Sequence, residues 1–285
     1  MDILVIGGTR FFGIPMVECL LAEGHHVTIA TRGITPDHFG DCVSRITLNI
    51  YDEESVTKAL QGREYDVVID KMGYGSKDVK AILDAVMCRH FIHMSTAGVY
   101  QLDHFDIREE EYAPEKEELV WCTRGDLGYD CEKRMAEAAI VQHYSHLDYT
   151  MIRSPYVMGA HDYTRRLLFY VEHIMKEIPM YIDNLDAKIS VANADETARF
   201  IAYVASGKGI GAVNCCSHGL FSIRELLEYV ESVTGKRCIL SADGEPAPYN
   251  GTVSYSLNLD KAQRTGFAFG QVQDWIGKVI LDYIY

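Results

Sequence analysis

The chain has 285 residues, a hydrophobic fraction of 48% and a formal net charge of −14 at pH 7. This length suits one large α/β domain or a core with a smaller cap, and the ordinary composition excludes a disordered chain. The acidic charge argues against a broad nucleic-acid-binding surface, because such surfaces neutralise phosphates with Lys and Arg.

The first predicted strand, Ile3–Ile6, runs directly into the segment Gly7–Gly13. Four aliphatic residues in succession predict a strand buried on both faces of a parallel sheet, and the apolar spacing from Ile14 to Leu21 predicts a helix. Strand, glycine turn and helix are typical of a dinucleotide-binding unit, in which a pyrophosphate meets bare backbone at a helix N-terminus. An ordinary strand-to-helix connection is the alternative interpretation. The predicted cofactor contacts of this segment are Gly7, Gly8, Thr9, Arg10, Phe11, Phe12 and Gly13.

A second predicted strand, 26–30, ends at Thr31 and Arg32, which are also predicted cofactor contacts. An NAD-binding unit usually places Asp or Glu here, where the carboxylate binds the adenine ribose, and this chain has neither. Arg10 and Arg32 instead offer two guanidinium groups where a 2′-phosphate would lie, so the sequence favours NADP, with NAD as the alternative. A solvent-facing Arg32 is the alternative interpretation.

Further strands are predicted at 45–48, 66–70, 90–94 and 149–153, and they alternate with helices at 54–60, 76–88 and from 129 to about 144. This alternation predicts an α/β protein with a doubly wound parallel sheet, a Rossmann fold, whose ligands collect at the carboxyl ends of the strands. Strand-end residues are therefore further predicted cofactor contacts: Asn49, Ile50, Lys71, Met72, Gly73, Ser154 and Tyr156. The very acidic segment 102–127 is interpreted as a solvated face.

The remaining chain mixes helices, predicted at 165–178, 194–205, 223–234 and 272–283, with short strands at 189–191, 213–216 and 238–240. We expect residues 1–158 to form the dinucleotide-binding core. Residues 159–285 would mainly form a small substrate-binding cap, with segments that return to the core. Arg165 and Arg166 stand at the start of a cap helix, where they would meet an anionic substrate or, alternatively, face solvent.

Tyr129 and Lys133 form a Y-x-x-x-K pair that shares one helix face. The Lys133 ammonium would stabilise the phenolate and pull the tyrosine pKa down from its unperturbed value of ~10. Thr96, at the end of strand 90–94, would supply a hydroxyl that orients a substrate carbonyl or alcohol, and Ser95 beside it is a candidate substrate contact. A surface helical pair is the alternative interpretation.

A second Y-x-x-x-K match, Tyr112 with Lys116, contains Pro114 and should not be helical. We therefore predict that Tyr112 has no part in the chemistry. The eight cysteines show no metal-like spacing, so we expect reduced thiols and no metal site. The immediate start of a core strand leaves no room for a signal peptide, and no apolar run is long enough for a membrane span, so we expect a cytoplasmic protein.

The segments 7–13, 95–100, 129–133, 153–159 and 222–226 together resemble the extended short-chain dehydrogenase/reductase family, the NAD(P)-dependent epimerase/dehydratase group. The resemblance implies an enzyme that acts by reversible hydride transfer on a sugar nucleotide or related carbonyl compound or alcohol. It implies Thr96, Tyr129 and Lys133 as catalytic residues and Asn49 where the family often has an adenine-contacting Asp. A small-molecule substrate and a homodimer are the partners it suggests.

The Gly-Gly-Thr-Arg-Phe form of the glycine turn is also similar to a branch that includes chloroplast stem-loop-binding proteins, which act on RNA. The alternative function is therefore a non-catalytic or RNA-associated protein that keeps the cofactor-binding fold. The complete set of Thr96, Tyr129 and Lys133 and the negative charge favour the enzyme.

Overall fold

A seven-stranded parallel sheet forms the centre of the computed structural model, which describes residues 1–285. Its strand order is β10-β6-β5-β4-β1-β2-β3, so the chain leaves β1 in both directions as a doubly wound fold requires. The strands are β1 (Asp2–Ile6), β2 (His26–Thr31), β3 (Val43–Thr47), β4 (Arg63–Asp70), β5 (Val86–Met94), β6 (Asp148–Arg153) and β10 (Gly211–Asn214). The predicted α/β Rossmann class is confirmed.

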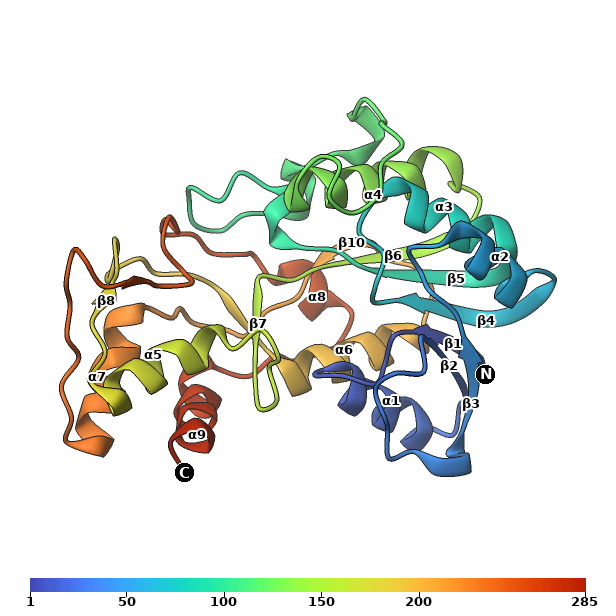
Figure 1. Ribbon diagram of the computed structural model, residues 1–285. Coiled ribbons are helices and arrows are strands. Elements are labelled where there is room, and N and C mark those ends of the chain that lie inside the picture. Colours follow the sequence, from blue (N-terminus) through green and yellow to red (C-terminus); the bar gives the residue numbers. More distant parts are fainter.

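Helices cover both faces of this sheet (Figure 1). Helices α2 (Glu53–Leu60), α3 (Ser76–Ala85) and α4 (Tyr129–His143) cover one face, and α1 (Gly13–Ala22) and α6 (Ala194–Ala205) cover the other. Alternate residues of β1 belong to the two apolar clusters: Ile3 and Val5 to one, Leu4 and Ile6 to the other. The first strand is therefore buried on both faces, as its unbroken apolar run predicted.

Most of the rest of the chain gathers at one end of the sheet, on the left in Figure 1. It contains α5 (Arg166–Lys176), α7 (Ile223–Thr234) and α9 (Val272–Ile284), with α5 packed on α7 and α9, whereas α8 (Asp260–Arg264) packs against β10. Two small parallel pairs join it: β7 (Tyr156–Met158) with β9 (Val191–Asn193), and β8 (Met180–Tyr181) with β11 (Glu245–Pro246). None of the helices is both long and apolar enough to cross a lipid bilayer.

Three predicted elements have different limits in the structure. The helix expected at 76–88 ends at Ala85, because Val86 already pairs with Arg63 in the longer β4–β5 ladder. The strand expected at 238–240 is reduced to a single bridge between Leu240 and Met180. The strand expected at 189–191 starts only at Val191. Apolar runs alone do not reveal which neighbours a strand can pair with.

The acidic segment 102–127 is only partly the solvated face that was expected. Glu110 and Glu111 are exposed, but Glu109 is buried and its Oε1 accepts a hydrogen bond of 2.9 Å from the Asn214 backbone N–H. Cys122 is also buried, against Ser76 at the start of α3. Short 3-10 turns at 97–99, 109–111 and 114–116, with a fourth at 40–42, are the other helical elements.

All eight cysteines are free thiols. Burial raises the pKa of Cys88 and of Cys216 to about 12, so both stay protonated at neutral pH. These side chains act as small apolar groups in the interior.

Candidate active site

A cavity of about 980 Å³ lies at the carboxyl ends of the sheet strands and extends toward α5. The glycine turn forms one part of its wall and the start of α4 another, so segments far apart in sequence meet there. The predicted residues that line it are Gly7, Gly8, Thr9, Arg10, Phe11, Phe12, Thr31, Arg32, Ile50, Lys71, Met72, Ser95, Thr96, Tyr129, Lys133, Ser154, Tyr156 and Arg166. Gly13, Asn49, Gly73 and Arg165 are not in the wall.

The glycine turn presents bare backbone to the cavity. Gly7 and Gly8 have φ angles of +106° and +98°, where a side chain would be strained. Gly13 allows the start of α1 to pack closely against the turn, because a Cβ at position 13 would lie only 2.9 Å from the Gly8 Cα. The backbone N–H groups of residues 9–12 have no acceptor within the protein. Free N–H groups before a helix N-terminus suit an anionic group such as a diphosphate.

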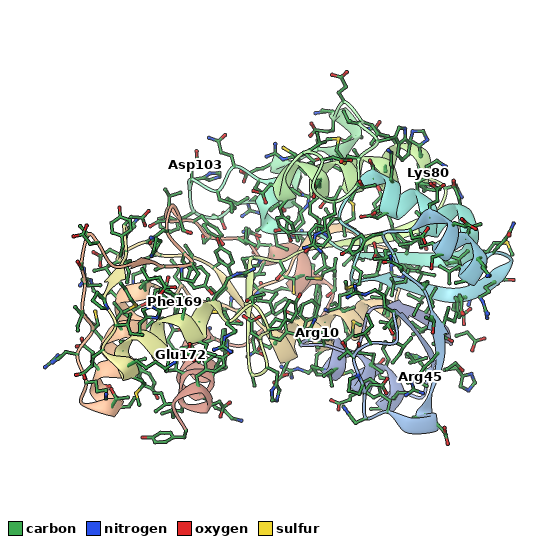
Figure 2. All side chains as sticks on the ribbon, in the orientation of Figure 1. Arg10, Arg45, Lys80, Asp103, Phe169 and Glu172 are labelled. Carbon is green, nitrogen blue, oxygen red and sulfur yellow. The ribbon has the colours of Figure 1, made fainter.

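Three cations face this part of the cavity without a carboxylate partner: Arg10, Arg32 and Lys71. The Lys71 ammonium lies 4.2 Å from the centre of the Phe12 ring, and burial together with Arg10 lowers its pKa to about 8. The Arg10 guanidinium lies 4.6 Å from the centre of the Tyr163 ring, in the middle of the molecule (Figure 2). Unpaired cations beside free N–H groups fit the phosphates of a dinucleotide.

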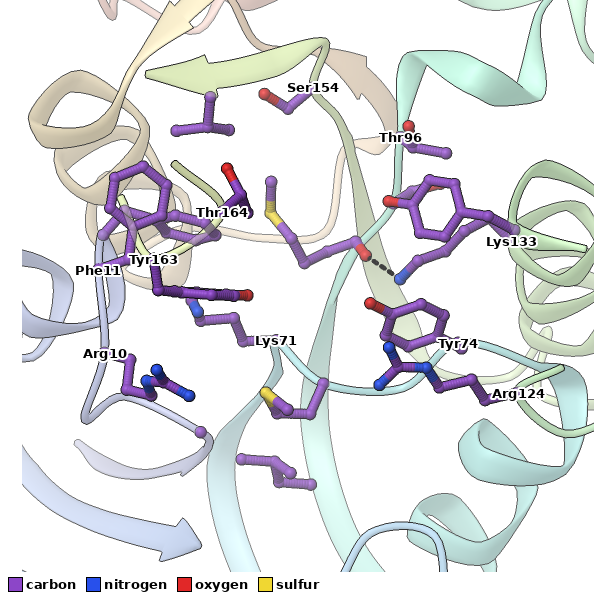
Figure 3. A pocket seen from close by; sticks show the side chains of 18 of the residues that line it. Arg10, Phe11, Lys71, Tyr74, Thr96, Arg124, Lys133, Ser154, Tyr163 and Thr164 are labelled. Atoms are coloured by element: carbon purple, nitrogen blue, oxygen red, sulfur yellow. Dashed lines mark hydrogen bonds between the residues drawn. The ribbon is translucent and has the colours of Figure 1, made fainter. Parts of the chain in front are cut away.

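Tyr129 and Lys133 line another part of the cavity together with Thr96; Figure 3 shows Thr96 and Lys133 on the same side of it. Tyr129 is the first residue of α4. The ring packs edge-on against Tyr74, with 5.5 Å between the ring centres. One turn later, the buried Lys133 Nζ donates to the carbonyl oxygens of Gly73 at 2.7 Å and Met94 at 2.6 Å.

The pKa values of this pair differ from the prediction. Burial raises the pKa of Tyr129 to about 12, and the nearby Thr96 hydroxyl opposes this only in part. Burial also lowers the pKa of Lys133 to about 8. The predicted lowering of the Tyr129 pKa is therefore wrong for the protein alone, because the loss of solvation around the phenol outweighs the groups that favour the phenolate. A further positive charge is needed to make the phenolate accessible.

Several predicted contacts already have hydrogen-bond partners within the protein. The Ser95 hydroxyl donates to the buried Glu137 carboxylate, so its proton is not free for a substrate. The Asn49 side-chain oxygen accepts from the Tyr51 N–H at 3.3 Å and stabilises its own turn. Thr31 Oγ1 likewise accepts from the Gly33 N–H at 3.1 Å.

The two arginines predicted at the cap helix have separate environments. Arg165 donates to Glu172 at 2.9 Å on the solvent side, so its predicted substrate contact is not supported. Arg166 is half-buried, lines the cavity and stacks 5.3 Å over the Tyr156 ring without a carboxylate partner. Only Arg166 is placed to meet a ligand.

Sequence reasoning missed part of the wall: Tyr51, Tyr74, Arg124, Asp130 and Tyr163. Arg124 donates to the Tyr51 hydroxyl at 3.1 Å and stacks 4.4 Å over the Tyr74 ring. Tyr74 follows Gly73, the last of the predicted contacts after β4, so the expectation that ligands collect at the carboxyl ends of the strands pointed to its neighbourhood. Arg124 and Tyr163 come from irregular segments that carry no periodic signal.

Comparison with known proteins identifies a family. Residues 7–170 match the model of the NAD(P)H-binding family. Over 204 residues, 66% of this chain, it is 28% identical to the chloroplast stem-loop binding protein of 41 kDa b from Arabidopsis thaliana. Over 85 residues it is 30% identical to 2′-dehydrokanamycin reductase from Streptomyces kanamyceticus. The matches span 50% and 24% of these two proteins, and 30% of this chain in the second case.

Solved structures share the fold along the whole chain. UDP-glucuronic acid 4-epimerase from Bacillus cereus, solved with NAD, is 18% identical with a TM-score of 0.74, covering 100% of this chain and 96% of that one. UDP-glucose 4-epimerase from Thermus thermophilus, also with NAD, is 20% identical with a TM-score of 0.72, covering 100% and 99%. The chain belongs to the NAD(P)H-binding family, as its resemblance to the extended short-chain dehydrogenases/reductases predicted.

Proposed function

We propose that the protein is an NAD(P)-dependent oxidoreductase or epimerase/dehydratase that acts by reversible hydride transfer on a sugar nucleotide or a related carbonyl compound or alcohol. The observation that carries the proposal is that Thr96, Tyr129 and Lys133 share one cavity with the glycine turn. A group bound along this cavity would touch both the free backbone N–H groups and the phenol.

The glycine turn, Arg10 and Lys71 would hold the cofactor's phosphates, and the nicotinamide would supply or accept the hydride. Arg10 and Arg32 together support NADP as the preferred cofactor, since each guanidinium can bind a 2′-phosphate. NAD is the alternative, because the epimerase structures that share the fold were solved with NAD.

Tyr129 would exchange the proton with the substrate hydroxyl while Thr96 orients the same oxygen. With a pKa of about 12, the phenol is protonated at neutral pH and so can serve as the proton donor, but its phenolate form is disfavoured. The positive charge of an oxidised nicotinamide, added to Lys133, would stabilise the phenolate when Tyr129 must act as a base.

Arg166 and Arg124 would bind the anionic part of the substrate. Both guanidinium groups line the cavity and neither pairs with a carboxylate. The structures of MoeE5 with UDP-glucose and with UDP-glucuronic acid share the fold at TM-scores of 0.76, which supports a nucleotide sugar as the substrate class.

The test is a turnover screen with the full chain. Nucleotide sugars are incubated with NADP⁺ or NAD⁺, nicotinamide reduction is followed by absorbance, and the sugar products are identified by NMR. We expect cofactor binding and at least one converted sugar. A protein that binds neither cofactor would refute the proposal.

A second candidate function is stem-loop binding, favoured by the 28% identity to the chloroplast stem-loop binding protein. The net charge of −14 argues against it. A filter-binding titration with a structured RNA at two salt concentrations separates the candidates. Salt-sensitive RNA binding, with cofactor binding but no converted sugar, would favour the second.

A further inference from the structure

Beneath Lys133 lies a buried acid–histidine pair that the mechanism above does not use. Asp70 ends β4, and His93 is its register partner on β5. Both side chains are fully buried, on the sheet face that α3 and α4 cover. His93 Nδ1 lies 2.9 Å from Asp70 Oδ2, and it must be the donor because an ionised carboxylate only accepts.

Asp70 also fixes the turn that holds Lys133. Its Oδ1 accepts from the backbone N–H groups of Met72 at 3.0 Å and Gly73 at 2.7 Å. The Gly73 carbonyl then accepts from Lys133 Nζ. A Cβ at Gly73 would collide with the Asp70 carboxylate, so the turn and the carboxylate are in close contact. One carboxylate thus orients an acceptor of the ammonium through a single turn.

Asp70 makes no direct ion pair with Lys133, yet among the four nearby carboxylates that favour the charged ammonium it contributes most, ahead of Asp78, Glu137 and Glu132. Two of the others are engaged away from the turn: Glu137 pairs with Arg153 at 2.6 Å, and Glu132 accepts from the Gly125 N–H at 2.6 Å. Asp78 caps the start of α3, where it accepts from the N–H groups of Tyr74 and Gly75 at 2.8 and 3.0 Å. Burial raises the pKa of Asp78 as well.

His93 does not neutralise Asp70. Burial and the nearby Lys133 lower the pKa of His93, so its imidazole is neutral at pH 7, while its hydrogen bond and Lys133 help to hold the pKa of Asp70 below its usual value. On the cavity side, the Tyr74 ring lies 5.2 Å from the Lys133 ammonium, the Arg124 guanidinium lies 4.4 Å from the same ring, and Tyr129 is neutral at pH 7. His93 Nε2 is buried without any hydrogen-bond partner. Burying the Asp70 carboxylate together with an unpartnered His93 nitrogen therefore costs folding free energy, and this cost favours a functional role for the pair over a stabilising one.

We propose that Asp70, oriented by His93, is the positioning residue that keeps Lys133 charged and in place beside Tyr129. The inference rests on the proposed function, in which Lys133 acts on the phenol. It assigns to the end of β4 a role that no cavity-lining residue performs.

The test removes the charge of Asp70 and keeps its shape. Asp70→Asn retains an oxygen for the Met72 and Gly73 N–H groups, and the Lys133 pKa is measured by NMR of protein labelled with ¹³C at lysine Cε, assigned through Lys133→Met. Burial lowers the Lys133 pKa and the Asp70 charge raises it, so without that charge we expect the Lys133 pKa to fall from about 8 by roughly one unit or more. The alkaline limb of kcat should move to lower pH by the same amount, with KM unchanged.

Two further variants separate charge from packing. His93→Asn keeps a donor near the Nδ1 position and leaves Asp70 charged, so the Lys133 pKa should stay within a few tenths of a unit. Asp84→Asn removes an exposed α3 carboxylate that pairs with Lys80 (labelled in Figure 2) and does not line the cavity, so it should have no effect on the Lys133 pKa. An unchanged Lys133 pKa in folded Asp70→Asn would overturn the inference.

A measurement on the wild-type protein covers the case in which Asp70→Asn does not fold. With ¹⁵N-labelled histidine, His93 should be neutral and protonated at Nδ1 between pH 6 and 8. An imidazolium at pH 7 would overturn the inference, because His93 would then neutralise Asp70. Neither titration needs a substrate: a fall in the Lys133 pKa without any turnover would refute only the proposed enzyme, and turnover with an unchanged Lys133 pKa would refute only the role of Asp70.

Discussion

Two groups of ionisable side chains lie in and beside the cavity, and they differ in whether they have hydrogen-bonding partners of opposite charge within the protein. The cationic wall, defined as Arg10, Arg32 and Lys71, faces the cavity without a carboxylate partner. The buried floor, defined as Asp70, His93, Glu137 and Arg153, is fully enclosed, and each of its members is hydrogen-bonded to another.

This difference separates binding from architecture. An unpaired ammonium with a lowered pKa, such as Lys71, is stabilised in its position only when a ligand brings negative charge. Glu137 and Arg153 already satisfy each other, so they contribute shape and not affinity. Substitutions of Glu137 and Arg153 should therefore change stability, and substitutions in the wall should change ligand affinity.

The largest effect is expected for Glu137→Ala in the floor. It leaves the Arg153 guanidinium, fully buried, without its 2.6 Å partner, which should lower the free energy of unfolding by roughly 3–5 kcal/mol in a urea titration. Glu172→Ala, which breaks the solvent-exposed pair with Arg165, is the control and should cost less than about 1 kcal/mol. Equal losses in both variants would contradict the distinction.

The next effect concerns catalysis. Tyr129→Phe keeps the ring and removes the proton donor, so kcat on a converted nucleotide sugar should fall by at least ~10²-fold while cofactor binding persists. Tyr112→Phe is the control, because that buried hydroxyl only donates to the Arg134 carbonyl at 3.1 Å. If both variants retain full turnover, Tyr129 is not the acid/base group.

A smaller effect is expected in the wall. Arg32→Ala should weaken NADPH by roughly 1.5–3 kcal/mol, about 10- to 150-fold in Kd by nicotinamide fluorescence, and leave NADH unchanged. Arg45→Ala provides a surface control, since Arg45 pairs with Asp37 at 2.6 Å (Figure 2). An equal loss for both cofactors would show that Arg32 does not bind a 2′-phosphate.

The smallest effect is expected for Arg166, the first residue of α5, and concerns substrate binding. Arg166→Ala should raise KM for a nucleotide sugar about tenfold, close to 1.4 kcal/mol, since one charge-assisted contact is lost. Arg165→Ala should leave KM unchanged, because Arg165 already pairs with Glu172 outside the cavity. A larger change for Arg165 than for Arg166 would reverse the assignment.

Local patterns predicted the framework of the cavity well. The run Ile3–Ile6 with its glycines, and the spacing of Tyr129 and Lys133, depend on neighbours in sequence and on strand and helix periodicity. The Rossmann class follows from that information alone. Most predicted strand-end residues line the cavity for the same reason, since parallel strands bring their carboxyl ends to one edge.

What the sequence did not predict depends on tertiary contacts. Arg165 and Arg166 are adjacent in sequence, yet only the second turns inward, because α5 begins at Arg166 and Arg165 takes a left-handed φ of 57° before it. The raised pKa of Tyr129 depends on the groups that the fold brings around the phenol, which no spacing reveals. Arg124 reaches the cavity from an irregular segment whose acidic neighbours gave it the appearance of a solvated loop.

Because α6 and β10 pack on the sheet that the first half of the chain forms, the two halves of the chain need each other to fold. α6 covers α1, whose Met16, Val17 and Leu20 are completely buried, and β10 pairs with the edge of β6. A fragment that stopped at residue 158 would expose that apolar helix face and leave an unpaired strand edge, a template for aggregation. The C-terminal half therefore cannot be removed as a unit, because it supplies one strand and one covering helix of the central sheet.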